Sequence, residues 1–209
     1  MLLSWWKSRI TSGGVRDNHK LDMEIKTAFI EDAEAILTLQ RLAYQSEAAV
    51  YDDFTIPPLT ETLENIKARF HDRRYLKAIE DGQIVGSVRA FQDGVGSHVE
   101  RLVVHPDYRR RGIGMALLNM VETCFPAARR FELFTGHKSE SNIRLYERIG
   151  YRAVRQEWVN EKVSLVYMEK TVGDPEKRPA CPVCGGQLQD IRRKLCCVQC
   201  HSIIETCCD

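Results

Sequence analysis

The chain has 209 residues, of which 44% are hydrophobic, and this length accommodates one full domain and a small second module. Its 30 Lys and Arg side chains balance 29 Asp and Glu side chains, which excludes the strongly basic surface that nucleic acid or an anionic membrane attracts. The apolar run from Leu2 to Trp6 is interrupted by Ser4 and is too short for a signal peptide or a membrane span. These features predict a cytoplasmic protein with no membrane partner.

The eight cysteines divide the chain, because seven of them follow residue 180 and only Cys124 lies earlier. Disulfides of a secreted fold would be spread more evenly. Residues 1–22 lack sustained periodicity and form an N-terminal extension. A main domain is predicted for residues 23–170, a polar, proline-containing linker for 171–180, and a cysteine-rich module for 181–209.

The first half of the main domain begins with a predicted strand at residues 23–28. Asp32 is typical of a helix N-cap, and an apolar stripe continues to about residue 45. A long connection with several aromatic and acidic residues covers 44–58, and Thr60 is expected to cap a second helix. Two strands, 75–80 and 84–91, flank an Asp81-Gly82 hairpin turn.

The second half contains a β-branched strand at 99–104, which Pro106 ends because proline has no N–H for a ladder. Apolar residues at helical spacing predict a helix that starts near Ile113. A strand at 131–135 and a helix at 142–149 follow, the helix capped by Ser139 or Ser141 and closed by Gly150. A hairpin of strands 151–159 and 163–168 completes the domain.

The turn before Ile113 carries features of an anion site. Gly112 and Gly114 lie in the first helical turn, where the absence of side chains lets a ligand reach the backbone amides. Those amides have no partner within the helix, and three arginines (Arg109, Arg110 and Arg111) precede them. This arrangement favours a pyrophosphate. Rossmann-type dinucleotide binding fits poorly, and a basic helix start that binds nothing is the other alternative.

The pattern Arg109-x-x-Gly112-x-Gly114 after a strand resembles the pyrophosphate motif of the GNAT acyltransferases. The element order and the late helix Asn142-Ile-Arg-Leu-Tyr-Glu-Arg-Ile-Gly-Tyr are also similar to that family over residues 23–170. The resemblance implies an α+β fold of the α/β/α sandwich type with a central mixed, mostly antiparallel sheet. It implies an N-acetyltransferase that moves an acetyl group from acetyl-CoA to a primary amine of a small molecule or a protein.

The resemblance also implies roles for individual residues. In the family the fourth strand diverges from the fifth, and its free backbone groups bind the pantetheine arm and polarise the thioester. The expected acetyl-CoA contacts are Leu102, Val103, Val104, Arg109, Arg110, Arg111, Gly112, Ile113, Gly114, Met115 and Asn142. Tyr146 matches the general acid that protonates the departing thiolate, the alternative being a half-buried core tyrosine.

Glu100 is the candidate general base. Alternation along a strand places it on the same face as Leu102 and opposite to Arg101. A solvated or ion-paired glutamate is the competing interpretation, since the register of one strand decides the matter. His98 and His105 are the next candidates.

The sequence says less about the identity of the acceptor. Glu47, Asp52 and Asp53 lie in the segment that forms one wall of the acceptor pocket in the family, which is consistent with a cationic amine and equally with a solvated acidic loop. A narrow pocket would favour metabolites, and an open groove would favour peptides.

Two C-x-x-C pairs, Cys181/Cys184 and Cys197/Cys200, stand 12 residues apart and predict structural Zn²⁺ held by four thiolates, in a segment that resembles a zinc ribbon. His201 stands where ribbons usually have glycine, so replacement of a ligand by His201 or Cys196 stays open. Cys207 and Cys208 are surplus. Four thiolates leave no open coordination position, so the metal is not expected to catalyse.

A competing function is a non-catalytic acyl-CoA sensor or scaffold whose ribbon binds a protein partner. Sequence favours the enzyme, because Tyr146 and Glu100 would both be idle in a sensor. Equal numbers of basic and acidic residues in the tail argue against nucleic acid as the ribbon's partner. A homodimer stays open.

Overall fold

A computed structural model of the chain describes residues 23–172, 181, 183–186, 188–191 and 194–204. The expected N-terminal extension, most of the expected linker, Cys207 and Cys208 lie outside these residues. The helices are α1 (Ala33–Tyr51), α2 (Pro57–Thr60), α3 (Leu63–Arg69), α4 (Ile113–Thr123) and α5 (Glu140–Arg148), with 3-10 turns at Ile30–Asp32 and Pro106–Tyr108. The strands are β1 (Glu24–Thr27), β2 (Arg74–Glu80), β3 (Gln83–Asp93), β4 (Gly96–Val104), β5 (Arg130–Gly136), β6 (Arg152–Trp158), β7 (Ser164–Thr171), β8 (Leu188–Ile191), β9 (Lys194–Cys197) and β10 (Ile203–Ile204).

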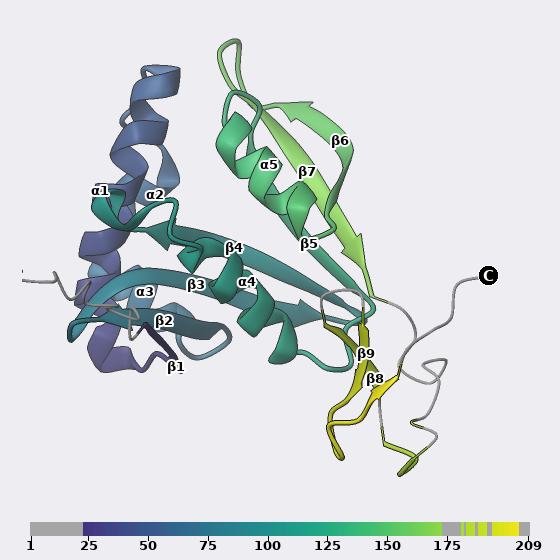
Figure 1. The fold of residues 1–209 in the computed structure, drawn as a ribbon. Helices are drawn as coiled ribbons and strands as arrows, with labels where there is room; N and C mark the ends of the chain where they lie inside the picture. Colours follow the sequence, from purple (N-terminus) through teal and green to yellow (C-terminus); the bar gives the residue numbers. More distant parts are fainter. Residues whose placement is uncertain (1–22, 173–180, 182, 187, 192–193, 205–209) are drawn as a thin grey trace, which may run out of the picture.

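Seven strands form one sheet in the order β1-β2-β3-β4-β5-β7-β6, which confirms the mixed, mostly antiparallel sheet of a GNAT-like α+β fold. Only β4 and β5 run parallel, and their ladder joins Gly96–His98 to Arg130–Glu132 and then stops. Beyond this point the two strands diverge like the arms of a V (Figure 1). Backbone groups in the second half of β4 are therefore not paired with β5.

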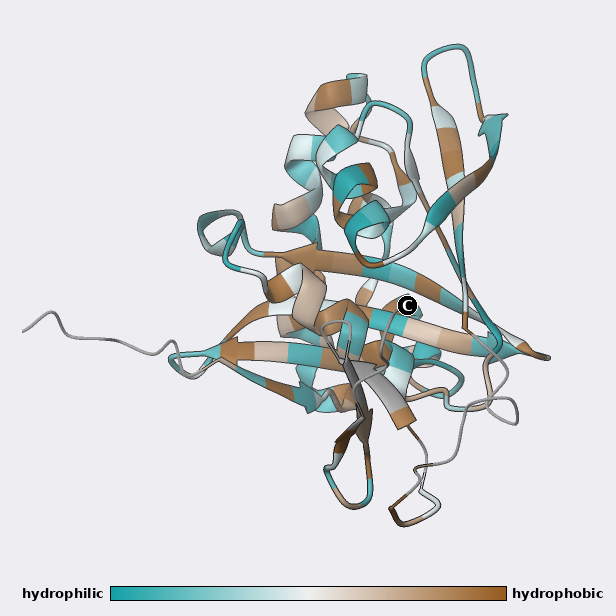
Figure 2. Ribbon diagram, turned by 45° about the vertical axis from the view of Figure 1, so that its right-hand side comes forward, coloured by the Kyte–Doolittle hydropathy of each residue, from teal (hydrophilic) through white to brown (hydrophobic). Residues whose placement is uncertain are grey.

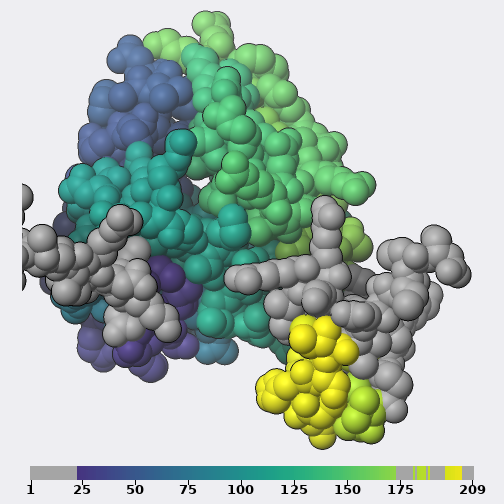
Figure 3. Space-filling view, in the orientation of Figure 1, coloured from purple at the N-terminus to yellow at the C-terminus, as the bar shows by residue number. Residues whose placement is uncertain are grey.

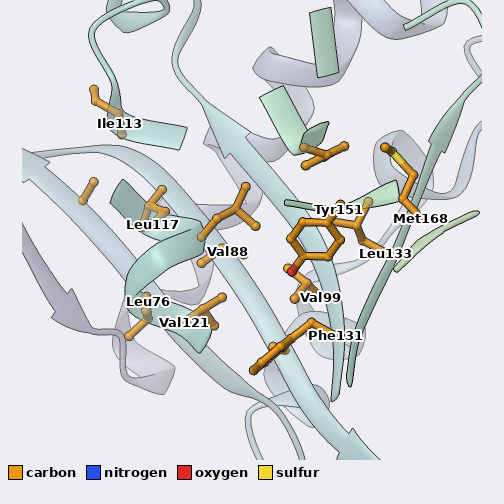
Figure 4. Close-up of a cluster of buried hydrophobic side chains, with 14 of the residues drawn as sticks. Leu76, Val88, Val99, Ile113, Leu117, Val121, Phe131, Leu133, Tyr151 and Met168 are labelled. Carbon is orange, nitrogen blue, oxygen red and sulfur yellow. The ribbon is translucent and has the colours of Figure 1, made fainter. Parts of the chain in front are cut away.

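Helix α4 packs on one face of β1 to β4. Its buried residues Ile113, Leu117, Leu118 and Val121 join the largest hydrophobic core (Figure 4). A Cβ atom on Gly86 of β3 would come within 3.0 Å of both Ile113 and Leu117, so only glycine allows the helix this close to the sheet. This close packing holds the N-terminus of α4 beside the end of β4.

Helices α1 and α3 cover the opposite face of the same strands. Ala33, Ile36, Leu37, Ile66 and Tyr75 form a second core there, and Leu39 and Ala43 pack on Val103 of β4. The hydropathy colouring shows apolar stretches along the central strands and polar residues at the loop tips (Figure 2). The sheet thus separates two layers of helices, as in an α/β/α sandwich.

Helix α5 packs against the β5–β7–β6 arm, where Tyr146, Leu133 and Met168 join the main core. Gly150 follows the helix with φ of 96° and lets the Tyr151 amide bond the Tyr146 carbonyl, which confirms Gly150 as the C′ residue. None of the helices in the described residues is both long and apolar enough to cross a membrane.

Two expectations about the first helices were wrong. Helix α1 continues to Tyr51 rather than ending near residue 45, because Ala48 and Tyr51 extend its buried stripe. Thr62 rather than Thr60 caps α3, its hydroxyl accepting from the Asn65 amide at 3.2 Å. Pro57 and Pro58 start the short helix α2, which includes Thr60 and which periodicity did not indicate.

Candidate active site and cysteine cluster

A cavity of about 810 Å³ occupies the space where β4 and β5 diverge. Residues of α1, α2, β4, β5, α5 and the turn before α4 line it. In the space-filling view an opening lies between the blue α1–α2 region and the green α5 region (Figure 3). The volume is within the range of small-molecule sites.

One end of the cavity is the N-terminus of α4. Gly112 is the N-cap with φ of 86°, and Arg110 is also left-handed with φ of 67°, so the turn curls around the helix start. The first bond within the helix joins the Ala116 amide to the Gly112 carbonyl, which leaves the amides of Ile113, Gly114 and Met115 without helical partners. All three residues line the cavity. This geometry suits an anion.

Two of the three arginines before this helix hold the turn in place. Arg109 donates to the Ala43 carbonyl of α1 at 2.8 Å, and Arg111 donates to Glu80 at 3.1 Å. Arg111 is not among the residues that line the cavity, whereas Arg109 and Arg110 are. The backbone amides and Arg110 are therefore the groups of this turn best placed for an anion.

The middle of the cavity is bounded by β4 and α5. Leu102, Val103 and Val104 line it along the unpaired part of β4, and Asn142 and Tyr146 line it from one face of α5, one helical turn apart. The Tyr146 side chain is 7% exposed, and burial raises the pKa of its phenol well above its usual value of 10.0. The phenol is therefore protonated at neutral pH, as a proton donor must be.

Glu100 does not lie where strand alternation placed it. The β3–β4 register shifts between Ser87 and Arg89, and Arg101 has φ of 51°, so a bulge interrupts the alternation. Glu100 consequently pairs with Arg89, and Arg101 lies near Glu61, both on the α1 side of the sheet. Leu102 packs instead into the core under α4. The expectation that Glu100 shares a face with Leu102 was wrong, although Glu100 still lines the cavity.

Sequence reasoning missed the ion-pair network beneath the cavity. Arg89, whose side chain is 2% exposed, donates to Glu61 at 3.0 Å and to Glu100 at 2.9 Å. Glu61 also accepts from the Gln40 amide at 2.8 Å. Burial acts to raise the pKa of the Glu61 carboxyl, but the hydrogen bond from Gln40 and the positive charges of Arg89 and Arg101 outweigh this effect and hold the pKa below its usual value. An arginine inside the apolar run of β3 was the available signal, because a buried charge requires a partner.

The C-terminal half of α1 also lines the cavity. Tyr44, Glu47 and Tyr51 lie on one face of the helix and line the cavity. Ser139 donates to Glu47, and the Tyr51 hydroxyl accepts from the Lys138 amide at 2.7 Å, so α1 is tied to the β5–α5 turn across the V. Asp53 lines the cavity, whereas Asp52 lies outside the lining and faces Lys162 at 3.9 Å.

Neither candidate histidine lines the cavity. His98 stacks on Phe91 and lies 3.8 Å from Glu132. His105 accepts from the Asp107 amide and makes an edge contact with Tyr108. The carboxylates of Glu47, Asp53 and Glu100 line the cavity and are therefore better placed than either imidazole to accept a proton there.

The four predicted cysteine ligands come together around the small sheet β10-β9-β8, of which only Cys197 is itself a strand residue. The sulfurs of Cys181, Cys184, Cys197 and Cys200 all lie within 4.8 Å of one another, at 3.7 Å for Cys181–Cys200 and 3.4 Å for Cys184–Cys197. Tetrahedral zinc with Zn–S bonds of about 2.3 Å needs sulfurs about 3.8 Å apart. The cluster fits a small zinc-binding segment, and among the described residues it includes neither Cys196 nor His201.

The backbone around this cluster is shaped for metal knuckles. The amides of Gln199 and Cys200 both point at the Cys197 sulfur at 3.4 Å. Gly185 has φ of 74°, and a Cβ atom on Gly186 would approach the Gln199 side chain to 2.8 Å. Glycine at these two positions lets the first turn close over the second.

Comparison with known proteins gives the family. The model of the acetyltransferase (GNAT) domain matches residues 43–172. An acetyltransferase of Pectobacterium atrosepticum is 30% identical over 135 residues, which cover 63% of this chain and 89% of that protein. The UPF0157 protein YqkA of Bacillus subtilis is 32% identical over 120 residues, which cover 57% of this chain but only 34% of YqkA. The chain thus spans about a third of the length of YqkA.

Solved structures agree on the fold. PaiA N-acetyltransferase of Thermoplasma acidophilum, solved in complex with coenzyme A, aligns with a TM-score of 0.57 at 19% identity, covering 73% of this chain and 100% of that one. A GNAT-family acetyltransferase of Streptococcus pneumoniae aligns with a TM-score of 0.60 at 19% identity over 73% and 100% of the two chains. With the diverging strands and the matched domain model, these findings show that the chain belongs to the GNAT acetyltransferase family.

Proposed function

We propose that this protein is an acetyl-CoA-dependent N-acetyltransferase whose acceptor is a primary amine. The observation that carries the proposal is one continuous cavity that runs from the free amides of α4, along the unpaired strand β4, to the protonated Tyr146. The coenzyme A bound to the similar PaiA N-acetyltransferase supports it. The acceptor amine belongs to a small molecule or to a protein.

In this proposal the pyrophosphate of acetyl-CoA binds the amides of Ile113, Gly114 and Met115 beside Arg110. The pantetheine arm adds to β4 along Leu102–Val104, since the backbone groups there are not paired with β5. Asn142 contacts the arm from α5. The thioester carbonyl then lies at the divergence of the strands, where backbone N–H groups stabilise the negative charge that builds on its oxygen.

The transfer requires one bond to form, one bond to break and two protons to move. The neutral amine attacks the carbonyl carbon, the C–S bond breaks as the tetrahedral intermediate collapses, and the amine loses one proton to a base. Tyr146 gives its proton to the departing thiolate and is restored from solvent. Glu100 is the proposed base through a bridging water; Arg89 and Arg73 both lie against its Oε2, which fixes the orientation of the carboxylate.

Glu100→Gln is expected to lower kcat/KM by roughly ten- to a hundredfold at low pH and by less at high pH. The acceptor is mostly protonated at low pH, so the loss of a base is felt most there. Measurement of kcat/KM against pH tests this, with Glu47→Gln as the matched variant because Glu47 lines the same cavity. A pH-dependent loss in Glu47→Gln and a uniform loss in Glu100→Gln would transfer the role to Glu47.

The competing function, a non-catalytic acyl-CoA sensor, predicts binding without turnover. The discriminating experiment is calorimetry with acetyl-CoA, followed by a thiol-release assay with a panel of amines. Binding together with amine-dependent release of coenzyme A supports the enzyme. Binding with no release above the rate without amine supports the sensor, and no binding contradicts both.

We further propose that the C-terminal segment binds one Zn²⁺ per chain through Cys181, Cys184, Cys197 and Cys200 and that the metal organises this segment without entering the reaction. The convergence of the four sulfurs supports this role. When bound, four thiolates saturate a tetrahedral ion, so it supplies cross-linking rather than Lewis-acid chemistry. A homodimer and a protein partner for the ribbon are further proposals. Light scattering of the purified protein tests both.

Removal of zinc by a strong chelator is expected to unfold residues 181–209 and to leave 23–170 folded, because so short a segment buries too little apolar surface to fold alone. Elemental analysis and hydrogen exchange measure the two effects. Cys197→Ser should lose the metal, while the matched variant Cys196→Ser, its neighbour on β9, should keep it. Affinity should fall with acid, since protons compete with zinc for thiolates. Protein purified without chelator and found free of zinc would contradict the assignment.

A further inference from the structure

Arg101 is the unusual residue of the acceptor side. It is not glycine, yet its φ is 51°, a conformation in which an ordinary side chain is strained. The bulge this creates turns Glu100 and Arg101 toward the same side of β4. The side chain of Arg101 is 18% exposed and lines the cavity beside the point where β4 leaves β5. Backbone strain of this kind occurs most often at functional sites.

The charges around Arg101 are already committed to other partners. Glu61 accepts from Gln40 at 2.8 Å through one oxygen and from Arg89 at 3.0 Å through the other, whereas Arg101 Nε lies 3.7 Å from Glu61, beyond hydrogen-bond distance. The carboxylate of Glu100 is bound by Arg89. The buried Nε atom of Arg101 has no hydrogen-bond partner among the described residues. The carboxylates of Glu61 and Glu100 therefore both hydrogen-bond to Arg89.

The network as a whole carries excess positive charge. Its guanidinium groups belong to Arg69, Arg73, Arg89 and Arg101, and the carboxylates that they face in the described part of the chain belong to Glu61, Glu100 and Asp72. Arginine stays protonated in proteins, so one positive charge is not balanced within the group. Of these four arginines, Arg101 is the one that lines the cavity.

A single residue on α1 connects this cation to the reacting centre. Tyr44 lines the cavity and lies close enough to Arg101, Glu47 and Tyr146 to interact with them electrostatically. Arg101 therefore lies near Tyr44 in the wall of the cavity, and Glu47 follows Tyr44 on the same face of α1. A molecule in this space would meet the cation of Arg101 and the carboxylate of Glu47.

We propose that Arg101 binds a carboxylate on the acceptor, so that the acceptor class is small molecules that carry both a primary amine and a carboxylate. This inference rests on the proposed N-acetyltransferase function and specifies its substrate. The planar guanidinium matches a carboxylate and can offer it two parallel N–H donors. The amine end of the acceptor would then be the end next to the thioester.

The test is a thiol-release assay with matched pairs of acceptors at saturating acetyl-CoA. Each pair consists of an amino acid and its carboxamide, which keeps the amine and side chain but removes the negative charge. A polyamine and a lysine-containing peptide with blocked ends complete the panel. At neutral pH the carboxamide has the larger fraction of unprotonated amine, so chemistry alone would favour the carboxamide and the comparison is biased against the proposal.

We expect at least one amino acid to be acetylated with kcat/KM about tenfold or more above that of its carboxamide. Arg101→Met should lower kcat/KM for that amino acid by about 10- to 100-fold and leave the carboxamide nearly unchanged, because it removes charge-assisted hydrogen bonds to the carboxylate alone. Arg101→Lys should restore part of the preference. The matched control is Arg73→Met, which removes an arginine of the same network that does not line the cavity and should keep the preference.

The outcomes separate this inference from the function on which it rests. Equal or better use of carboxamides, polyamine or peptide would show an acetyltransferase and overturn the role of Arg101, as would an unchanged preference in Arg101→Met. Acetyl-CoA binding without acetylation of any amino acid would also count against the inference. Failure to bind acetyl-CoA would contradict the proposed function itself. Calorimetric affinity for acetyl-CoA establishes that each variant is folded before its preference is compared.

Discussion

Gly112→Asp is expected to weaken acetyl-CoA binding by roughly 10- to 1000-fold. A Cβ atom at this N-cap position meets no other atom within 4 Å, so the new carboxylate extends into the space before the free amides of α4. A negative charge about 4 Å from a phosphate costs about 4 kcal/mol at the dielectric of a protein surface, and salt reduces this. Calorimetric titration with acetyl-CoA measures the loss.

Gly112→Asn is the matched control for this charge effect. Both substitutions place a side chain of the same shape at φ of 86°, a backbone conformation that Asn and Asp tolerate better than other residues at a cost of about 1–2 kcal/mol. The strain is therefore shared, and the difference between the variants isolates the charge. Gly114→Asp is less informative, because a Cβ atom there would lie 3.3 Å from Leu145 and disturb packing as well. Equal acetyl-CoA affinities for Gly112→Asp and Gly112→Asn would contradict an anion site at this helix end.

Tyr146→Phe is expected to lower kcat by roughly 10- to 1000-fold with little change in acetyl-CoA affinity. The substitution removes the proton donor and keeps the ring that packs in the main core. Because burial raises the pKa of Tyr146, the wild-type phenol should stay protonated across the usual assay range, and loss of its proton should not limit activity below about pH 10. Steady-state kinetics against pH measure both effects.

Tyr151→Phe provides the matched control. Tyr151 is also buried and lies 6.1 Å from Tyr146 between ring centroids, but its hydroxyl donates to Glu122 and it does not line the cavity. This variant should lose about 1.5–3 kcal/mol of unfolding free energy, because the lost hydrogen bond is to a carboxylate, and it should keep its kcat. If kcat fell equally in both variants, core packing rather than proton donation would explain the effect, and Tyr146 would be a core tyrosine.

Local sequence was sufficient for most of the elements, for the start of α4 and for the two cysteine turns. Period and turn chemistry placed the strands, the start of α4 at Ile113 and the closure of α5 at Gly150, because these depend on residues close together in the chain. The two C-x-x-C turns also act locally, since each fixes a pair of sulfurs whatever the rest of the chain does. The first amides of any helix lack a helical partner, so the free amides of Ile113, Gly114 and Met115 could be predicted from the start of α4.

Tertiary structure decided which side chains share the cavity. The bulge at Arg101 arises from how β4 pairs with β3, and no rule of strand alternation contains it, so Glu100 lies on a different face from the one expected. Arg109 and Arg111 were expected to bind the anion, yet partners on α1 and β2, distant in sequence, hold both side chains. The sequence by itself determined the order of most elements and the free amides at the start of α4, through short-range periodicity and turn residues. The charged residues at the cavity were decided only when long-range packing assembled Glu61, Arg89 and Arg101 beneath the divergence of β4 and β5.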